Sequence, residues 1–174
     1  MSNDAADAHS LRTLGLLLRG TLHELANPVL GLTGTAELAL DHAEPGTKLH
    51  DRITLIQRTG AEVADIVRAL QAFVRLQSAP VESFSLGHAA AETVALVDLV
   101  LPTHSVTLTA TGDAEVIAAP GEVRCSLVEL LHAALERGDP GGVIELAVRS
   151  EGNEAVVTAT GGGQLRLPVA ARTG

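Results

Sequence analysis

The sequence has almost no aromatic residues. It contains no tryptophan and no tyrosine, and Phe73 and Phe84 are its only phenylalanines. Proteins that bind single-stranded nucleic acid stack the bases on aromatic side chains, so this composition argues against such a platform. The single cysteine, Cys125, excludes an intramolecular disulfide and a cysteine-based metal cluster. Cys125 falls in an apolar helical pattern, and we expect it to be a buried structural thiol.

Positive charge is also scarce. Lys48 is the only lysine, and 21 acidic residues against 12 lysines and arginines give a formal net charge of −9. This charge disfavours a nucleic-acid backbone as partner. No run of about 18 apolar residues occurs, and the first residues are acidic, so we expect no membrane span and no secretory signal. We therefore expect a cytoplasmic protein that contacts neither nucleic acid nor membrane.

The first half of the chain has a helical period. Apolar residues recur there in steps of three and four, on both sides of a break at 43–47. This pattern predicts two long helices over roughly 9–42 and 47–77, joined as a hairpin, with Thr47 capping the second helix. The apolar stripe is wider than a two-stranded coiled coil needs. It therefore predicts a four-helix bundle formed by a two-fold symmetric dimer.

The second half changes to short alternating runs separated by glycine and proline turns. The runs predict two helices, at 87–100 and 120–137. They also predict strands at 83–86, 105–110, 115–118, 143–149, 155–159 and 164–169. We therefore expect an α+β fold with two domains. Residues 1–78 form the dimerising hairpin, and residues 79–174 form a small α/β sandwich.

Residues 23–28 read His-Glu-Leu-Ala-Asn-Pro and fall within the first predicted helix. A neutral imidazole nitrogen can attack phosphorus and hold a phosphoryl group, which makes His23 a candidate nucleophile. Glu24 can take the proton of the other ring nitrogen. Asn27 shares the helix face of His23 four residues on, and Arg19 shares it four residues back. Their amide and guanidinium groups suit phosphoryl oxygens.

The same helix contains residues that weaken it. Pro28 removes one backbone hydrogen bond, and we expect it to bend the helix just beyond His23. Gly20, Gly31 and Gly34 each cost about 1 kcal/mol relative to alanine. Their bare backbone would let another protein approach closely, so we predict that they contact a partner. Taken one at a time, each of these residues has a structural explanation, and their combination favours a functional site.

The segment Leu22-His-Glu-Leu-Ala-Asn-Pro-Val-Leu-Gly31 resembles the phosphoacceptor box of sensor histidine kinases. In that family the box lies in a dimeric helical hairpin that precedes an ATP-binding domain. The resemblance implies that His23 is the phosphorylated residue and that Glu24 is its acid/base partner. It links Asn27 to removal of the phosphoryl group.

The second half departs from that family at its nucleotide boxes. The helix that should read Asn-Leu-Leu-x-Asn-Ala has Glu129 and Ala133 at the asparagine positions. The glycine-rich box has Ala159 where the family has the aspartate that reads adenine, followed by Thr160 and the glycines 161–163. Without these polar contacts, little is left to hold ATP and magnesium.

The combination resembles histidine phosphotransferases built on a degenerate kinase scaffold, the ChpT type. This resemblance implies a two-component phosphorelay in which His23 accepts a phosphoryl group from a receiver aspartate and passes it to another receiver. It implies a homodimer with no cofactor of its own, because the receiver brings the magnesium ion. Response-regulator receivers, and an upstream hybrid histidine kinase, are the expected partners. Two alternatives stay open: a pseudokinase that only docks receivers or kinases, and an atypical sensor histidine kinase.

Overall fold

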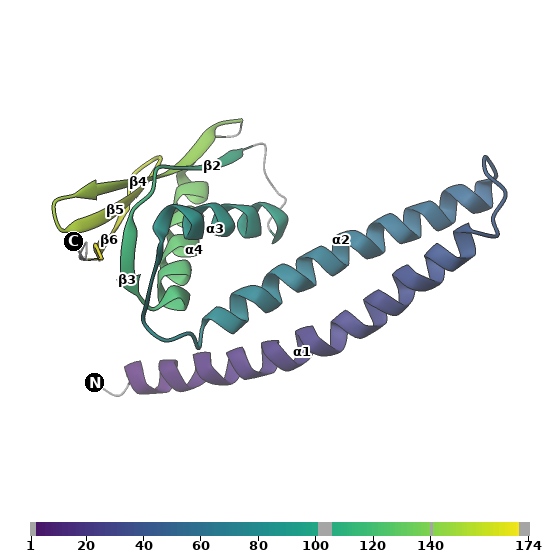
Figure 1. The fold of residues 1–174 in the computed structure, drawn as a ribbon, viewed down its shortest axis with the longest axis horizontal. Helices are drawn as coiled ribbons and strands as arrows, with labels where there is room; N and C mark the ends of the chain where they lie inside the picture. Colours follow the sequence, from purple (N-terminus) through teal and green to yellow (C-terminus); the bar gives the residue numbers. More distant parts are fainter. Residues whose placement is uncertain (1–2, 101–105, 140, 171–174) are drawn as a thin grey trace. The chain divides into compact units, whose positions relative to one another are not determined.

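The computed structural model describes the backbone of residues 3–100, 106–139 and 141–170, and their side chains from Leu17 onward except that of Arg19. The chain divides into two compact units, Met1–Arg75 and Leu76–Gly174. Figure 1 shows that the first consists of helices and the second combines helices with strands. The predicted α+β class is therefore confirmed.

The first unit is a helical hairpin of α1 (Asn3–Leu40) and α2 (Lys48–Leu76). Helix α1 begins at Asn3 rather than near residue 9. Alanines favour helix in this first segment, and acidic side chains stabilise a helix N-terminus. The hydroxyl of Thr47 accepts the backbone N–H of His50 at 3.2 Å, which confirms the predicted cap of α2.

Small residues make up much of the seam between the two helices. Leu22 and Ala36 of α1 are buried there against Gly60, Ala64 and Val67 of α2. Leu22 and Ala36 are two heptads apart, and the three residues of α2 follow one another in steps of four and three, so each set lies on one face of its helix. The seam is thus narrow, and only part of the apolar surface of the hairpin is buried within it.

Helices α1 and α2 approach each other closely at Gly60. A Cβ atom added to Gly60 would lie 2.6 Å from the Cγ2 atom of Thr33. The hydroxyl of Thr33 donates to the carbonyl of Val29 at 3.0 Å, which holds its rotamer. Any larger residue at position 60 must therefore push the helices apart.

Gly60→Ala is expected to lower the free energy of unfolding by about 1–3 kcal/mol, because overpacking outweighs the gain in helix propensity. Gly34→Ala is the matched control, since nothing lies within 4 Å of its added Cβ. It should raise the same quantity by up to about 1 kcal/mol. Urea unfolding followed by circular dichroism measures both. Equal shifts of the same sign would contradict the packing.

The described residues of the second unit form two helices and two sheets. The helices are α3 (Leu86–Val100) and α4 (Pro120–Arg137). Strands β1 (Glu82–Ser85) and β3 (Glu115–Ala118) form an antiparallel pair. The larger sheet has the order β2-β4-β5-β6 and contains β2 (Thr107–Thr111), β4 (Val143–Glu151), β5 (Glu154–Ala159) and β6 (Gln164–Pro168). Strand β2 pairs parallel with β4, and the other neighbours are antiparallel. Residue 105, predicted as the start of a strand, lies outside the described residues.

The core of this unit is aliphatic, as the composition requires. Leu86 of α3, Leu127 and Leu131 of α4, and Leu146 and Val157 of the larger sheet are fully buried in it. Alternate residues of β4 and β5 point into this core, so both helices cover the same face of that sheet.

One buried charge ties the two helices of this unit together. The Arg124 guanidinium of α4 pairs with the Glu92 carboxylate of α3. The other carboxylate oxygen of Glu92, Oε1, lies 3.2 Å from Nε2 of His88.

Cys125 differs from the expectation, because its side chain is half-buried and its thiol donates to Oε1 of Gln77 at 3.3 Å. Desolvation raises the pKa of the Cys125 thiol, so the thiolate is disfavoured.

Asp113 holds the start of α3. Its Oδ1 atom accepts hydrogen bonds from the Gly87 and Ala114 backbone N–H groups and from the Ser85 hydroxyl, each at 2.8 Å. These bonds favour the carboxylate form and lower the pKa of Asp113 below its ordinary value of 3.8, and the bond from Gly87 has the largest effect. The carboxylate therefore stabilises the folded state wherever it is ionised.

Asp113→Asn is expected to reduce the free energy of unfolding at pH 7 by about 1 kcal/mol, a small value because the carboxylate is exposed. A lowered folded-state pKa adds stability above the unfolded-state pKa, and that stability is lost as pH falls through the folded value. The difference between wild type and variant should therefore disappear in acid, below the ordinary pKa. Urea titrations at neutral and acidic pH measure it. The exposed Asp98, replaced by asparagine, is the control, and an equal effect there would contradict the assignment.

Candidate functional site

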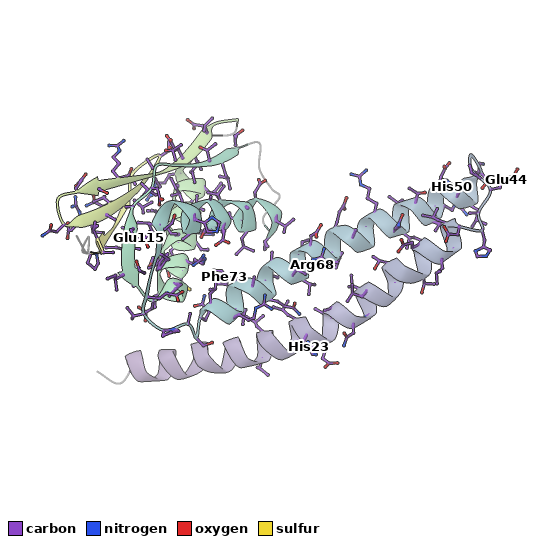
Figure 2. All side chains as sticks on the ribbon, viewed as in Figure 1. His23, Glu44, His50, Arg68, Phe73 and Glu115 are labelled. Carbon is purple, nitrogen blue, oxygen red and sulfur yellow. The ribbon has the colours of Figure 1, made fainter. Side chains whose placement is uncertain are left out.

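His23 lies near the middle of α1 and is exposed (Figure 2). The residue before it, Leu22, is buried in the seam at 6% exposure. Each helical residue advances about 100° around the axis, so His23 follows on the flank of the hairpin. The sequence Leu22-His23 thus fixes one side chain against α2 and presents the next to solvent.

Glu24 and Asn27 are exposed as well. Asn27 lies one turn beyond His23, so the two side chains lie on the same side of α1. Glu24 is the next residue around the helix. Within the described part of the chain, the side chains of His23, Glu24 and Asn27 form no hydrogen bond or ion pair. All three predicted catalytic residues are therefore open to a partner protein.

The predicted partner-contacting residues lie on the same helix. Gly20, Gly31 and Gly34 have nothing within 4 Å of an added Cβ atom. None of them is needed for packing within the hairpin, in contrast to Gly60. Arg19 lies in α1 as predicted, but its side chain is outside the described residues.

Helix α1 continues through Pro28 without a break. Pro28 has no N–H to donate to the carbonyl of Glu24, so the helical ladder lacks one bond directly after the site. The hydroxyl of Thr35 donates to the carbonyl of Gly31 at 2.7 Å, a back-bond of the kind that bends helices. Figure 1 shows that α1 is curved rather than straight.

One contact near His23 was not predicted. The Nε2 atom of Gln71 in α2 donates to the carbonyl oxygen of Leu22 at 3.1 Å. That carbonyl belongs to the peptide group joining Leu22 to His23. The available sequence signal was a polar residue at a seam position of α2, but identifying its acceptor required the register of the two helices.

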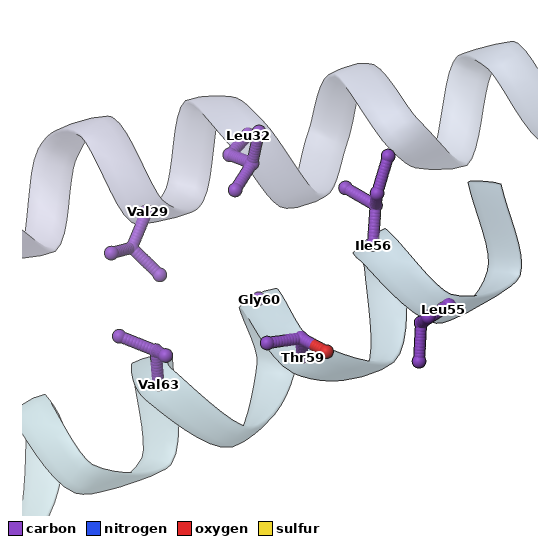
Figure 3. Close-up of a pocket in the computed structure, with 7 residues that line it drawn as sticks. All are labelled: Val29, Leu32, Leu55, Ile56, Thr59, Gly60 and Val63. Atoms are coloured by element: carbon purple, nitrogen blue, oxygen red, sulfur yellow. The ribbon is translucent and has the colours of Figure 1, made fainter. Parts of the chain in front are cut away.

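The hairpin has an apolar side that is not buried. Leu18, Leu25 and Leu32 recur every seven residues along α1 and are between 43% and 52% exposed. Leu49, Ile56 and Val63 form a second such row on α2. The two rows meet around a hollow of about 380 Å³ (Figure 3). It is lined by Val29, Leu32, Leu55, Ile56, Thr59, Gly60 and Val63. We call this surface the apolar face.

His23 does not belong to the apolar face. It is two residues from Leu25 and nine from Leu32, which places it about 160–180° away from this row around α1. A protein that covered the apolar face would therefore leave the imidazole accessible. The exposed leucines of the hairpin and the His23 side chain thus lie on different surfaces.

In the second unit, the positions of the family's nucleotide boxes lie at α4 and the turn after β5. Glu129 is exposed and Ala133 is half-buried on α4, and Ala159 is buried at the end of β5. Each of the glycines 161–163 has a positive φ, a conformation that favours glycine.

The glycine turn packs against α4. The guanidinium of Arg137 donates to the carbonyl of Gly162 at 2.9 Å. A Cβ atom added to Gly163 would lie 2.7 Å from Cδ1 of Leu130. An apolar side chain and a hydrogen-bonded cation thus fill the space where this turn faces α4.

The described residues contain no group of three or more histidine, cysteine, aspartate or glutamate side chains arranged to hold a metal ion. His132 is exposed on α4, where Glu129 and Glu136 are its neighbours in the helix. None of the described helices combines the length and apolar character required to span a membrane.

No family model matches the sequence, and no curated protein matches it. Solved structures do resemble the chain. A bacterial phosphotransferase aligns with 84% of this chain and 66% of its own, at 16% identity and a TM-score of 0.48. Full-length ShkA in complex with AMPPNP aligns with 82% of this chain, at 16% identity and a TM-score of 0.47.

The histidine kinase ThkA is similar in two structures, both at 17% identity and a TM-score of 0.41. Its catalytic domain aligns with 46% of this chain, and its complex with the response regulator protein TrrA aligns with 87%. The chain spans 57% of the catalytic-domain structure, 46% of the kinase in the complex and 32% of ShkA. At these sequence identities and TM-scores, a shared activity does not follow from the structural similarity.

Proposed function

We propose that this protein is a histidine phosphotransfer protein of a two-component phosphorelay. His23 accepts a phosphoryl group from the aspartyl phosphate of one receiver domain and passes it to the aspartate of another. The observation that carries the proposal is the exposed imidazole of His23 on the flank of α1, with Glu24 and Asn27 within one turn and likewise exposed. A macromolecular donor can reach a nucleophile only if it projects in this way.

The chemistry needs only this imidazole and the receiver. In the accepting step, the lone pair of one ring nitrogen attacks phosphorus and a nitrogen–phosphorus bond forms. The bond between phosphorus and the aspartyl oxygen breaks, and the receiver carboxylate leaves with the electron pair. The proton on the other ring nitrogen passes to Glu24 or to water. In the donating step, the carboxylate of a second receiver attacks, and the imidazole recovers a proton as it leaves.

Three substitutions in the second unit support a relay that does not bind ATP. Glu129 and Ala133 replace the amides that would hold magnesium and phosphates, and Ala159 replaces the acid that would read adenine. Leu130 lies close to Gly163 of the glycine turn, and Arg137 donates to the carbonyl of Gly162. In this proposal the magnesium ion belongs to the receiver, and the second unit is a docking surface and a support for the dimer.

The apolar face supports a homodimer. A second copy brings the same two rows of aliphatic side chains, and a two-fold axis through this face completes a four-helix bundle. The face of each copy would then be covered by an identical face, while both copies of His23 stay accessible to receiver domains. Receivers of response regulators and of an upstream hybrid histidine kinase are the proposed partners, and the cytoplasm is the proposed location.

A comparison of phosphoryl donors tests the proposal. The purified protein is incubated with phosphorus-labelled receivers, and in parallel with labelled ATP. Label that passes from a receiver to the wild-type chain, and onward to a second receiver, supports the relay. Labelling by ATP alone would contradict the loss of the nucleotide site. No label from any receiver would favour the alternative of a pseudokinase that only docks receivers or kinases.

A further inference from the structure

The hydrogen bond from Gln71 to Leu22 joins residues 49 positions apart and spans the two helices of the hairpin. Gln71 is half-buried. Its neighbours one turn away on the same face, Val67 and Val74, are aliphatic. An amide in such a place costs about 1–3 kcal/mol if it lacks a partner. The bond to the Leu22 carbonyl therefore determines how the Gln71 side chain is oriented.

The acceptor lies at the site itself. The Leu22 carbonyl has two lone pairs, one for the N–H of the fourth residue on in the helix and one for Gln71. The Leu22 side chain is buried in the seam at the same level. The peptide group that precedes His23 is thus held to α2 twice, by a packed side chain and by a hydrogen bond.

The helix is weaker immediately after this anchor. The missing N–H of Pro28 leaves the Glu24 carbonyl without its helical donor, and Gly31 and Gly34 lower the helix propensity of the next turns. Motion of α1 beyond residue 24 would therefore be transmitted to His23 unless the turn before it were fixed. Gln71 fixes the rotation of α1 at that turn.

We propose that Gln71 is a positioning residue for phosphoryl transfer at His23. It acts through the Leu22–His23 peptide group and sets the direction in which the imidazole projects from the flank of the hairpin. This inference rests on the proposed function of His23. Transfer between two proteins requires the nitrogen, phosphorus and leaving oxygen to be nearly in line, and a displacement of about 1 Å can cost about 100-fold in rate.

Gln71→Leu keeps the size of the side chain and removes the donor. With a phosphorylated receiver as donor, we expect the maximal transfer rate to fall about tenfold, with the half-saturating receiver concentration unchanged. Labelling by phosphoramidate, a small donor that needs no docked orientation, should stay as in wild type. Gln57→Leu is the matched control. Gln57 precedes Gln71 by two heptads, is half-buried in the same row and forms no hydrogen bond among the described residues. It should leave all three quantities unchanged.

Gln71→Glu tests the hydrogen bond through the pH dependence of the transfer rate, which a purely structural role of residue 71 would not change. A protonated carboxyl group can donate to the Leu22 carbonyl, and a carboxylate cannot. Its transfer rate relative to wild type should therefore rise as the pH falls from 7 toward the ordinary glutamate pKa of about 4.3. A ratio that does not change with pH would contradict donation from this position.

Amide hydrogen exchange decides the inference independently of receivers. In Gln71→Leu the backbone amides of residues 22–26 should exchange about tenfold faster than in wild type, and in Gln57→Leu they should not. Unchanged exchange, an unchanged transfer rate, or equal effects of the two leucine variants would each overturn the positioning role. If no receiver labels the wild-type protein, the proposed function fails, and hydrogen exchange still shows whether Gln71 fixes this turn.

Discussion

His23→Gln is expected to lower phosphoryl acceptance from receivers to background, by at least about a thousandfold. Glutamine has a similar length and polarity, but its amide nitrogen has no lone pair free to attack phosphorus. The loss should not come from unfolding, because surface substitutions usually change the free energy of unfolding by less than about 0.5 kcal/mol. The measurement is label on the protein after incubation with a labelled receiver, at protein concentrations matched by circular dichroism.

His42→Gln is the control for this result. His42 is also exposed and lies directly after α1, where its Nδ1 atom contacts the carbonyl of Leu38 at 2.9 Å. It has an exposed carboxylate beside it, that of Asp41, but no amide side chain one turn away, and it lies outside the helix. Its replacement should therefore leave acceptance at the wild-type level. Label that persists in His23→Gln and disappears in His42→Gln would show that His42, and not His23, is the acceptor.

Charges placed on the apolar face are expected to abolish the proposed dimer. In Leu32→Glu/Ile56→Glu both substitutions border the hollow between the helices. The two-fold symmetry of the proposed dimer would place each of them twice in the interface. Losing four buried aliphatic side chains weakens association by at least about 6 kcal/mol, or about 10⁴-fold in the dissociation constant. Desolvating the new carboxylates adds to this cost. Sedimentation velocity should show the mass of one chain where wild type shows two.

Leu38→Glu is the control that distinguishes a specific effect on the proposed interface from a general effect of removing an exposed leucine. Leu38 is 67% exposed, and it lies about 120° around α1 from Leu32, away from the apolar face. This variant should remain dimeric. Helix content of the double variant is followed by circular dichroism, so that loss of the dimer and loss of the hairpin are told apart. A double variant that keeps the dimeric mass would show that the apolar face is not the dimer interface.

Periodicity and turn chemistry predicted most of the secondary structure. Pro120 begins α4 at the predicted residue, because proline suits the first turn of a helix. Helix α4 also ends at Arg137, directly before Gly138, as predicted. Thr47 could be recognised as a cap from its own side chain and the residues that follow. His23, Glu24 and Asn27 could be identified because they lie within five consecutive residues. Signals of this kind act over one or two turns and are visible in the sequence.

Contacts between distant segments could not be predicted in the same way. The bond from Gln71 to Leu22 depends on how far α2 slides along α1, and the heptad pattern is the same for several such registers. The parallel pairing of β2 with β4 skips the intervening elements in the chain. The hydrogen bond from the Cys125 thiol to Gln77 joins residues 48 positions apart. Each of these features is set by packing that the local pattern does not specify.

The exposed rows of leucine, isoleucine and valine along the hairpin have a thermodynamic consequence. If a second copy covers them, folding and association are linked, and the stability of the hairpin increases with the concentration of the chain. Dilution would then remove the folded acceptor, and the melting temperature would rise with protein concentration. If the proposed function also holds, a cell that makes less of this protein would lose phosphoryl-accepting capacity more steeply than in proportion, because the concentration of dimers would fall as the square of the free monomer concentration.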